Sequence, residues 1–213
     1  MPPLATLPVF AVASLVLLVV PGPAVLYIVA RSGAQGTRAG LVSIAGVHAA
    51  SGMHVVAAAA GLSALLVASS VAFTAVKTAG GLYLVYLGVK AMRSAHRSVD
   101  LPFVTRRGTR RLFVEGFVVN LFNPKVALFF LAFLPQFIDA DGAPVWIQTL
   151  VLGGLYIVLG LCSDGLYALL GARLGGWFTR RSEGVRFTRY AEGGILVGLW
   201  VLTLAIPHRP SRR

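Results

Sequence analysis

The chain has 213 residues, of which 57% are hydrophobic and 12% are charged, so it is too apolar for a water-soluble domain. Its net charge of +12 comes from short basic segments without interleaved aromatic residues, which argues against nucleic acid as a partner. The apolar residues recur in runs of about 20, the length that spans the hydrocarbon of a bilayer. We therefore expect an all-α integral membrane protein that contacts lipid.

The apolar runs predict six transmembrane helices with short connections between them. The first run has no Lys or Arg before it and is too long for the apolar core of a signal peptide, so we interpret it as a span. Gly33 and Gly36 supply turn residues after it. The predicted spans are residues 4–30, 40–66, 71–91, 113–135, 145–171 and 187–206.

The first and fourth spans are interrupted near their middles by helix-breaking residues. These are Pro21, Gly22 and Pro23 in the first span and Asn120, Asn123, Pro124 and Lys125 in the fourth. Because proline lacks a backbone donor, each break leaves carbonyls unpaired, which a membrane tolerates only in buried backbone or beside a wet cavity. Paired breaks in corresponding places of two halves predict the binding site of a transporter.

The two breaks divide the chain into halves of three spans each. We expect three-helix repeats at residues 1–91 and 113–213, joined by a basic linker at 92–112. An odd number of spans per repeat would make the repeats inverted relative to each other. The first, third and fifth connections are basic and the others are not, which predicts cytoplasmic basic loops and both termini outside. Glycine-rich helix faces make a homodimer a reasonable expectation.

Ionisable residues inside the spans are functional candidates, because charge is costly in hydrocarbon. We expect Asp164 to exchange a proton or bind a cation, and its alternative role is to pair with Lys125 or an arginine. Lys125 would bind a substrate carboxylate, helped by the positive end of the half-helix after the break. His48 and His54 are six residues apart and do not share a helix face, so they do not form a metal pair. Of the two, His54 is the candidate proton relay.

The other polar residues of the fourth span have structural explanations as well. Asn120 and Asn123 could bond to the carbonyls that Pro124 frees, or they could present their amides to a ligand. Glu115 is expected to cap the start of that helix.

Motifs of enzymes and of bound cofactors or metals are not found in the sequence. GAQGTRAG lacks the lysine and hydroxyl residue of a phosphate-binding loop, and there is no nucleophile elbow or His/Cys metal spacing. We expect neither catalysis nor a cofactor nor a structural metal.

Three segments of the sequence carry a family resemblance: PGPAVLYIVARSGAQGTRAGLVSIAGV, GGLYLVYLGVKAMR and FVEGFVVNLFNPKVALFFLAFLPQF. They resemble the lysine/homoserine exporters (the LysE/RhtB type) of the bacterial inner membrane. The resemblance implies a secondary carrier that expels amino acids or related metabolites with the proton gradient. Many relatives have an acidic residue in the second span where this chain has Ser51, so either His54 replaces it or proton coupling differs in this chain.

The working hypothesis is an amino-acid exporter that works by alternating access. Lys125 and the half-helix ends would hold the substrate carboxylate, and carbonyls at the breaks would hold its ammonium group. Asp164 would couple export to proton entry. Two alternatives remain at this point: a carrier that expels a metal cation or another small ion, and a membrane scaffold that transports nothing.

Overall fold

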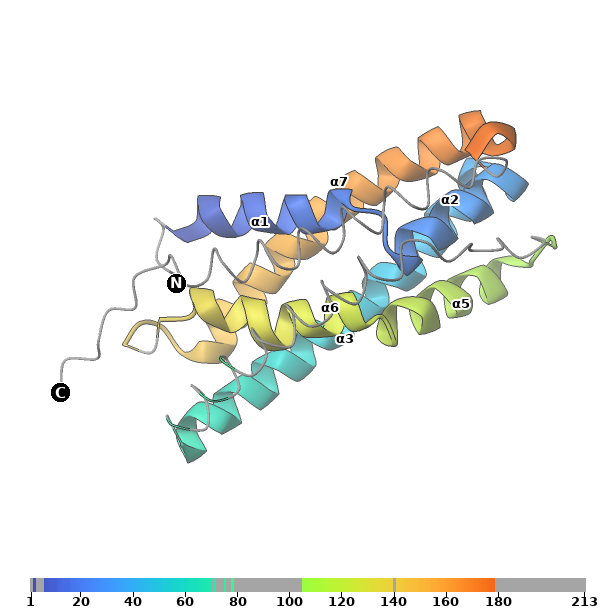
Figure 1. Cartoon of the computed structure of the whole chain (residues 1–213). Helices are drawn as coiled ribbons and strands as arrows, with labels where there is room; N and C mark the ends of the chain where they lie inside the picture. Colours follow the sequence, from blue (N-terminus) through green and yellow to red (C-terminus); the bar gives the residue numbers. More distant parts are fainter. Residues whose placement is uncertain are drawn as a thin grey trace.

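The computed structural model describes residues 6–69, 105–139 and 141–178, together with positions 2, 71, 75 and 78. The predicted spans at 71–91 and 187–206 lie outside these residues, apart from the three isolated positions, as does the linker before residue 105. The described residues form only helices (Figure 1). These are α1 (Leu7–Val19), α2 (Pro23–Gln35), α3 (Thr37–Ala68), α5 (Thr109–Leu121), α6 (Pro124–Leu128), the π-helical turn η3 (Phe129–Phe133), the 3-10 turn η4 (Leu134–Phe137) and α7 (Val145–Phe178).

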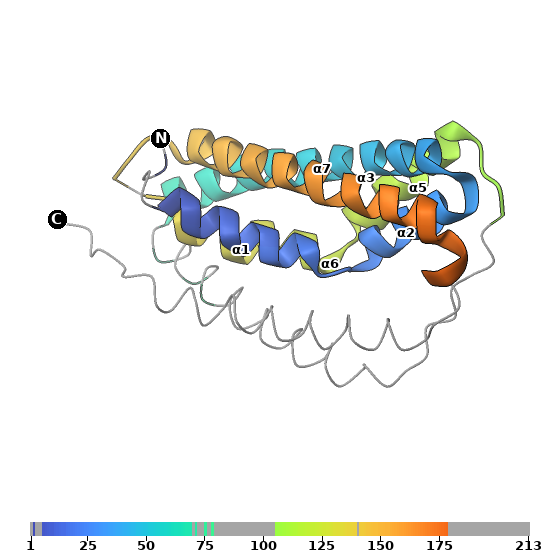
Figure 2. The ribbon, with the colours of Figure 1, turned by 90° about the horizontal axis from the view of Figure 1, so that it is seen from above.

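The two long apolar helices, α3 and α7, pack against each other and against the shorter helices. Their segments Thr37–Ala64 and Val145–Arg173 are long and apolar enough to cross a membrane, which agrees with the spans predicted at 40–66 and 145–171. The two helices lie side by side and run in opposite directions (Figure 2). On α7, every fourth residue from 152 to 168 is buried, so a single stripe of this helix faces its neighbours.

Each of the other two described spans is a pair of helices with a bend between them. The bend is 54° between α1 and α2, and 50° between α5 and the segment that starts at Pro124. The interruptions predicted in the first and fourth spans are therefore confirmed. The two bent pairs run in opposite directions along the molecule, and their bends lie near its middle (Figure 1).

The connection between α2 and α3 is a single glycine. Gly36 has a φ of 83°, a left-handed conformation that suits glycine, and its N–H donates to the carbonyl of Ser32. Gly33 lies inside α2, so the prediction that it forms part of the turn was wrong. A single glycine inside a helix costs only about 1 kcal/mol relative to alanine, so α2 continues through Gly33 and ends where Gly36 adopts a positive φ.

An aromatic cluster holds α1 against the second bent pair. Phe10 of α1 lies 5.7 Å from the ring of Phe129 and 5.1 Å from that of Phe137, measured between ring centroids. Phe129 also lies 4.6 Å from the ring of Tyr156 on α7. Such tilted and edge-to-face pairs stabilise a core beyond the area that they bury. This cluster fixes the segment that follows the second break.

Close backbone packing joins α3 to α5. A Cβ atom on Gly46 would lie 2.1 Å from the carbonyl oxygen of Phe113, and one on Gly116 would lie 2.6 Å from that of Ser43. Only glycine fits at these two positions. Small residues at such contacts are typical of helices that associate in lipid.

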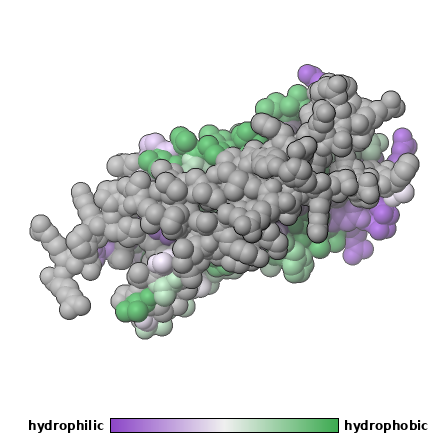
Figure 3. All heavy atoms as spheres, viewed as in Figure 1, coloured by the Kyte–Doolittle hydropathy of each residue, from purple (hydrophilic) through white to green (hydrophobic). Residues whose placement is uncertain are grey.

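The surface of the described part is apolar along the helices and polar at one end. Val12, Val56 and Leu166 are 61%, 62% and 59% exposed, as side chains facing lipid would be. Most of the strongly hydrophilic residues in view gather at the end where α2 and α5 lie (Figure 3).

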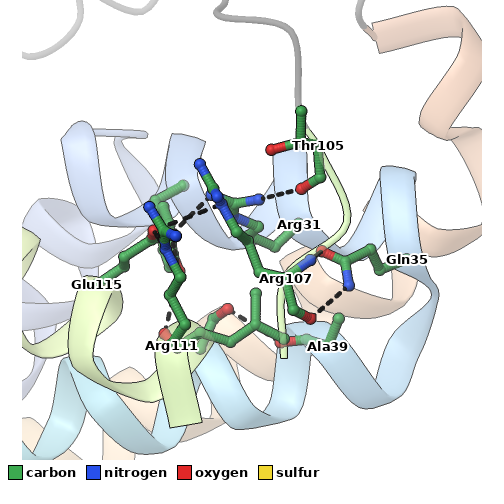
Figure 4. Close-up of polar contacts among 10 residues, drawn as sticks. Arg31, Gln35, Ala39, Thr105, Arg107, Arg111 and Glu115 are labelled. Carbon is green, nitrogen blue, oxygen red and sulfur yellow. Dashed lines mark hydrogen bonds and ion pairs between the residues drawn. The ribbon is translucent and has the colours of Figure 1, made fainter. Parts of the chain in front are cut away.

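At this polar end, one carboxylate pairs with three arginines (Figure 4). Glu115 lies 2.7 Å from the guanidinium of Arg31, 2.8 Å from that of Arg111 and 3.6 Å from that of Arg107. The expectation that Glu115 caps its helix was wrong, because α5 begins at Thr109 and its first turn has no acidic residue. Glu115 instead joins α2 to α5.

The end of the linker is attached to the same place. Arg31 donates to the carbonyl of Thr105, and the side-chain amide of Gln35 exchanges two hydrogen bonds with the backbone of Arg107 (Figure 4). The basic segment before α5 is thereby fixed on α2.

Candidate functional site

The two helix breaks meet in the middle of the protein. Lys125, the second residue of α6, extends to the first break, and its Nζ donates to the carbonyl oxygen of Val20 at 2.7 Å. Lys125 is only 7% exposed. The buried ammonium group of Lys125 thus connects the start of α6 with the end of α1.

At each break, a side chain from a long helix approaches a carbonyl that proline cannot pair. Pro23 has no N–H for the carbonyl of Val19, and the hydroxyl of Tyr167 on α7 donates to that oxygen. Pro124 likewise has none for the carbonyl of Asn120, which accepts the backbone N–H of Asn123 at 3.1 Å and lies 3.4 Å from Nε2 of His54 on α3. The breaks are therefore completed from other helices, as buried irregular backbone in a membrane requires.

The two asparagines of the second break have different tasks. The Oδ1 atom of Asn123 accepts the backbone N–H of Lys125 at 3.1 Å, so Asn123 is the N-cap of α6. Asn120 turns its amide away from the break. Its Nδ2 donates to the carbonyl of Val47 at 2.8 Å and to the hydroxyl of Ser51 at 2.9 Å. Asn123 thus supports the break directly, whereas the side chain of Asn120 fastens α5 to α3.

The buried carboxylate of α7 is paired with a histidine of α3. Nε2 of His48 lies 3.0 Å from Oδ2 of Asp164, and the two residues are 8% and 3% exposed. Among the described residues, the ion pair of Asp164 is with His48 and not with Lys125 or an arginine, the partners expected for it. Oδ1 of Asp164 and Nδ1 of His48 are buried without a hydrogen-bond partner among the described residues. A buried acceptor of this kind costs about 1–3 kcal/mol, and more when it is charged.

A glycine makes room for this pair. The ring of His48 lies over Gly160, one helical turn before Asp164, where an added Cβ would approach Cε1 of the ring to 2.5 Å. Any larger residue at 160 would push the imidazole away from the carboxylate.

These groups surround one small cavity. The space open to the centre of a water molecule is about 30 Å³, enough for about two waters. Five of the predicted site residues contribute to its lining: Gly22, Asn120, Asn123, Lys125 and Asp164. Among the described residues, His48, Ser51 and Tyr156 also contribute polar groups to its lining. The cavity therefore combines an ammonium group, a carboxylate and several amide or hydroxyl groups.

Four predicted site residues do not line the cavity. Pro21, Pro23 and Pro124 act through the backbone that they break. His54 is partly buried and stacks on Phe130, with the rings 6.0 Å apart and 10° from parallel. Of the two histidines on α3, the one that faces the carboxylate is His48.

His48 is a cavity residue that the sequence analysis placed behind His54, and Tyr156 is one that it did not consider. The sequence does carry a signal for His48: Gly160 precedes Asp164 by four residues, so both lie on one face of α7. A glycine one turn from a buried carboxylate leaves space for a large partner ring from another helix.

Comparison with known proteins identifies the family of the chain. A family model described as "LysE type translocator" matches residues 15–206. The chain belongs to this family. An uncharacterised membrane protein of Pseudomonas aeruginosa is 30% identical to this translocator over 189 residues, 86% of this chain and 88% of that protein.

Two relatives of this translocator bear the names of substrates. The homoserine/homoserine lactone efflux protein of Salmonella typhimurium is 36% identical over 158 residues, 74% of this chain and 76% of that protein. The leucine efflux protein of the same organism is 27% identical over 198 residues, 89% of this chain and 88% of that protein. No solved structure matches the translocator at a significant level.

Proposed function

We propose that this LysE-type translocator exports amino acids or close derivatives across the bacterial inner membrane, by proton antiport with alternating access. The single observation that supports this most is the cavity between the two breaks, where Lys125 and Asp164 supply opposite charges. A free amino acid has one group of each sign. The relatives named for homoserine and leucine efflux favour the same class of substrate.

Lys125 is the residue that we assign to the carboxylate group of the substrate. Its ammonium group now donates to the carbonyl of Val20, and a substrate carboxylate would replace this weaker neutral acceptor. The N-terminus of α6 lies at the same residue and adds the positive end of a helix dipole.

Alternating access requires the cavity to open, because about 30 Å³ holds water but not an amino acid. The bends at residues 20–22 and 122–123 supply places where half-helices can move as units. We propose that the repeats at 1–91 and 113–213 are inverted and rock against each other around the cavity, with the basic loops in the cytoplasm. The opposite directions of the two bent pairs support this symmetry.

Proton coupling is assigned to Asp164. It is a carboxylate buried in the cavity, and His48 is within hydrogen-bond distance to receive or supply a proton. His54 would act indirectly, through the carbonyl of Asn120.

Counterflow in proteoliposomes tests the proposed function. The purified protein is reconstituted, loaded with unlabelled L-homoserine or L-leucine, and exposed to a trace of the labelled compound. We expect transient accumulation above the level in protein-free vesicles, and less of it with Lys125→Met. Failure of a panel of amino acids to exchange, in protein that elutes as a single folded species, would refute an amino-acid exporter. Efflux of a divalent cation by the same vesicles would favour the ion-carrier alternative.

A further inference from the structure

One carboxylate that lines the cavity, that of Asp164, has an oxygen without a hydrogen-bond partner among the described residues. Oδ2 of Asp164 is engaged by His48, while Oδ1 is buried without a partner among the described residues. Asp164 is also the only acidic side chain among the described residues that line the cavity. This oxygen is the strongest acceptor in the cavity for a cationic ligand group.

The other acceptors first considered for a ligand cation already have donors. The carbonyl of Val20 accepts from Lys125, and the carbonyl of Val19 accepts from Tyr167. An ammonium group placed on either carbonyl would share that oxygen with the donor already bound, and on the carbonyl of Val20 it would lie beside the positive charge of Lys125. Asp164 offers a carboxylate oxygen, Oδ1, that no donor among the described residues occupies.

His48 occupies the carboxylate in the way that an ammonium group would. Its ring places one N–H donor at 3.0 Å from Oδ2, and its other nitrogen has no partner among the described residues. Within the described part of the chain, the bond to Asp164 is therefore the one hydrogen bond of the imidazole, so a better donor can take its place.

We propose that Asp164 binds the ammonium group of the transported molecule and that His48 is the group it displaces. This proposal rests on the function proposed above and defines its substrate class as small molecules with a free primary ammonium group. A free carboxylate on the substrate would be bound separately, by Lys125.

The same arrangement explains how one carboxylate can couple two fluxes. Asp164 can hold the substrate ammonium group or a proton, but not both at once. When the substrate leaves to the outside, a proton takes its place on the carboxylate and is released to the cytoplasm when the next substrate binds. The other titratable groups near Asp164 among the described residues are His48 from α3, Lys125 from α6, and Tyr156 and Tyr167 from α7.

Removal of the His48 imidazole from Asp164 should strengthen substrate binding, and two substitutions test this. His48→Phe keeps a ring over Gly160 but has no donor, and Gly160→Ala displaces the ring while both ionisable groups stay. We expect each variant to lower the half-saturating concentration of L-homoserine in counterflow by about threefold or more, because the binding-competent fraction rises. Asp164→Asn should raise it by about tenfold or more. Gly154→Ala is the matched control on α7, since a Cβ there meets no atom within 4 Å.

Competing compounds test the ligand class. Homoserine lactone keeps the ammonium group without the carboxylate and should inhibit the counterflow of L-homoserine. N-acetyl-L-homoserine keeps the carboxylate without the ammonium group and should not inhibit.

The outcomes separate this inference from the proposed function. If the wild type exchanges homoserine but folded His48→Phe and Gly160→Ala bind it no more tightly, His48 is a structural partner and the displacement is refuted. Equal inhibition by N-acetyl-L-homoserine would refute the ammonium site. A wild type that exchanges no amino acid overturns the proposed function and this inference together.

Discussion

The ammonium group of Lys125 lies 2.7 Å from the carbonyl oxygen of Val20, so the residue that restarts the second broken helix also completes the end of the first. The two residues are 105 positions apart in the chain. This bond makes the two breaks a single unit, and a ligand that draws Lys125 away loosens both at once. The cavity is thereby linked to the geometry of the two half-helices.

Replacement of Lys125 by methionine should impair transport selectively. The backbone N–H of residue 125 keeps its bond to Asn123, so α6 still has its cap. Loss of a charged hydrogen bond to the substrate should lower the counterflow of L-homoserine by about tenfold or more. Homoserine lactone, without a carboxylate, should lose much less. Equal loss for both compounds would mean that Lys125 serves the structure rather than the carboxylate.

Replacement of Asp164 by asparagine should uncouple transport from the proton gradient. In vesicles that are more acidic on the side from which protons enter, the wild type should accumulate substrate on that acidic side faster than at equal pH. The asparagine side chain cannot take up a proton, so at saturating substrate the variant should exchange at a rate that the gradient does not change. Asp164→Glu, which keeps a carboxylate, is the control. An undiminished response to the gradient in Asp164→Asn would place the coupling proton elsewhere.

The breaks could be predicted from the sequence because they follow from covalent chemistry. Pro23 and Pro124 lack a backbone N–H in any tertiary context, so a helix through either residue must lose a bond. The lengths of α3 and α7 were predictable for a similar reason, since hydrocarbon thickness sets the length of an apolar run.

The partners across helices could not be predicted in the same way. His48 and Asp164 meet because α3 and α7 have a particular rotation and offset, which hydropathy does not determine. Glu115 was misread because the span was predicted to begin at residue 113, which placed this residue in the first turn. The helix begins at Thr109, and Arg31, from the other half of the chain, is the partner that decides its role.

Loss of the carboxylate of Glu115 should weaken the polar end of the molecule. Arg31 and Glu115 are 12% and 26% exposed at their side chains, so the pair is only partly screened by solvent. Glu115→Gln leaves the three arginines close together without their common anion. We expect a lower melting temperature in detergent, by about 2–4 °C for each kcal/mol lost.

Arg110→Gln is the matched control for this change, because Arg110 is exposed and forms no ion pair with the other described residues. A melting temperature that falls as far in Arg110→Gln as in Glu115→Gln would contradict a specific role for Glu115. Addition of salt should narrow the difference between wild type and Glu115→Gln, since exposed parts of the cluster are screened.

Insertion of one methyl group at Gly46 should separate α3 from α5. The new Cβ would lie 2.1 Å from the carbonyl oxygen of Phe113, and backbone cannot move aside as a flexible side chain can. We expect Gly46→Ala to reduce the yield of folded protein and its melting temperature, although alanine favours a helix by about 1 kcal/mol over glycine. Gly61→Ala on the same helix meets no atom within 4 Å and should be neutral or stabilising, as measured by size-exclusion elution and thermal unfolding. If both variants behave alike, the close contact of α3 and α5 does not contribute to stability. If only Gly46→Ala lowers the melting temperature, the contact of α3 with α5 stabilises the fold. Asn120 and Ser51, which line the cavity, form a hydrogen bond between the same two helices, so this contact also supports the cavity.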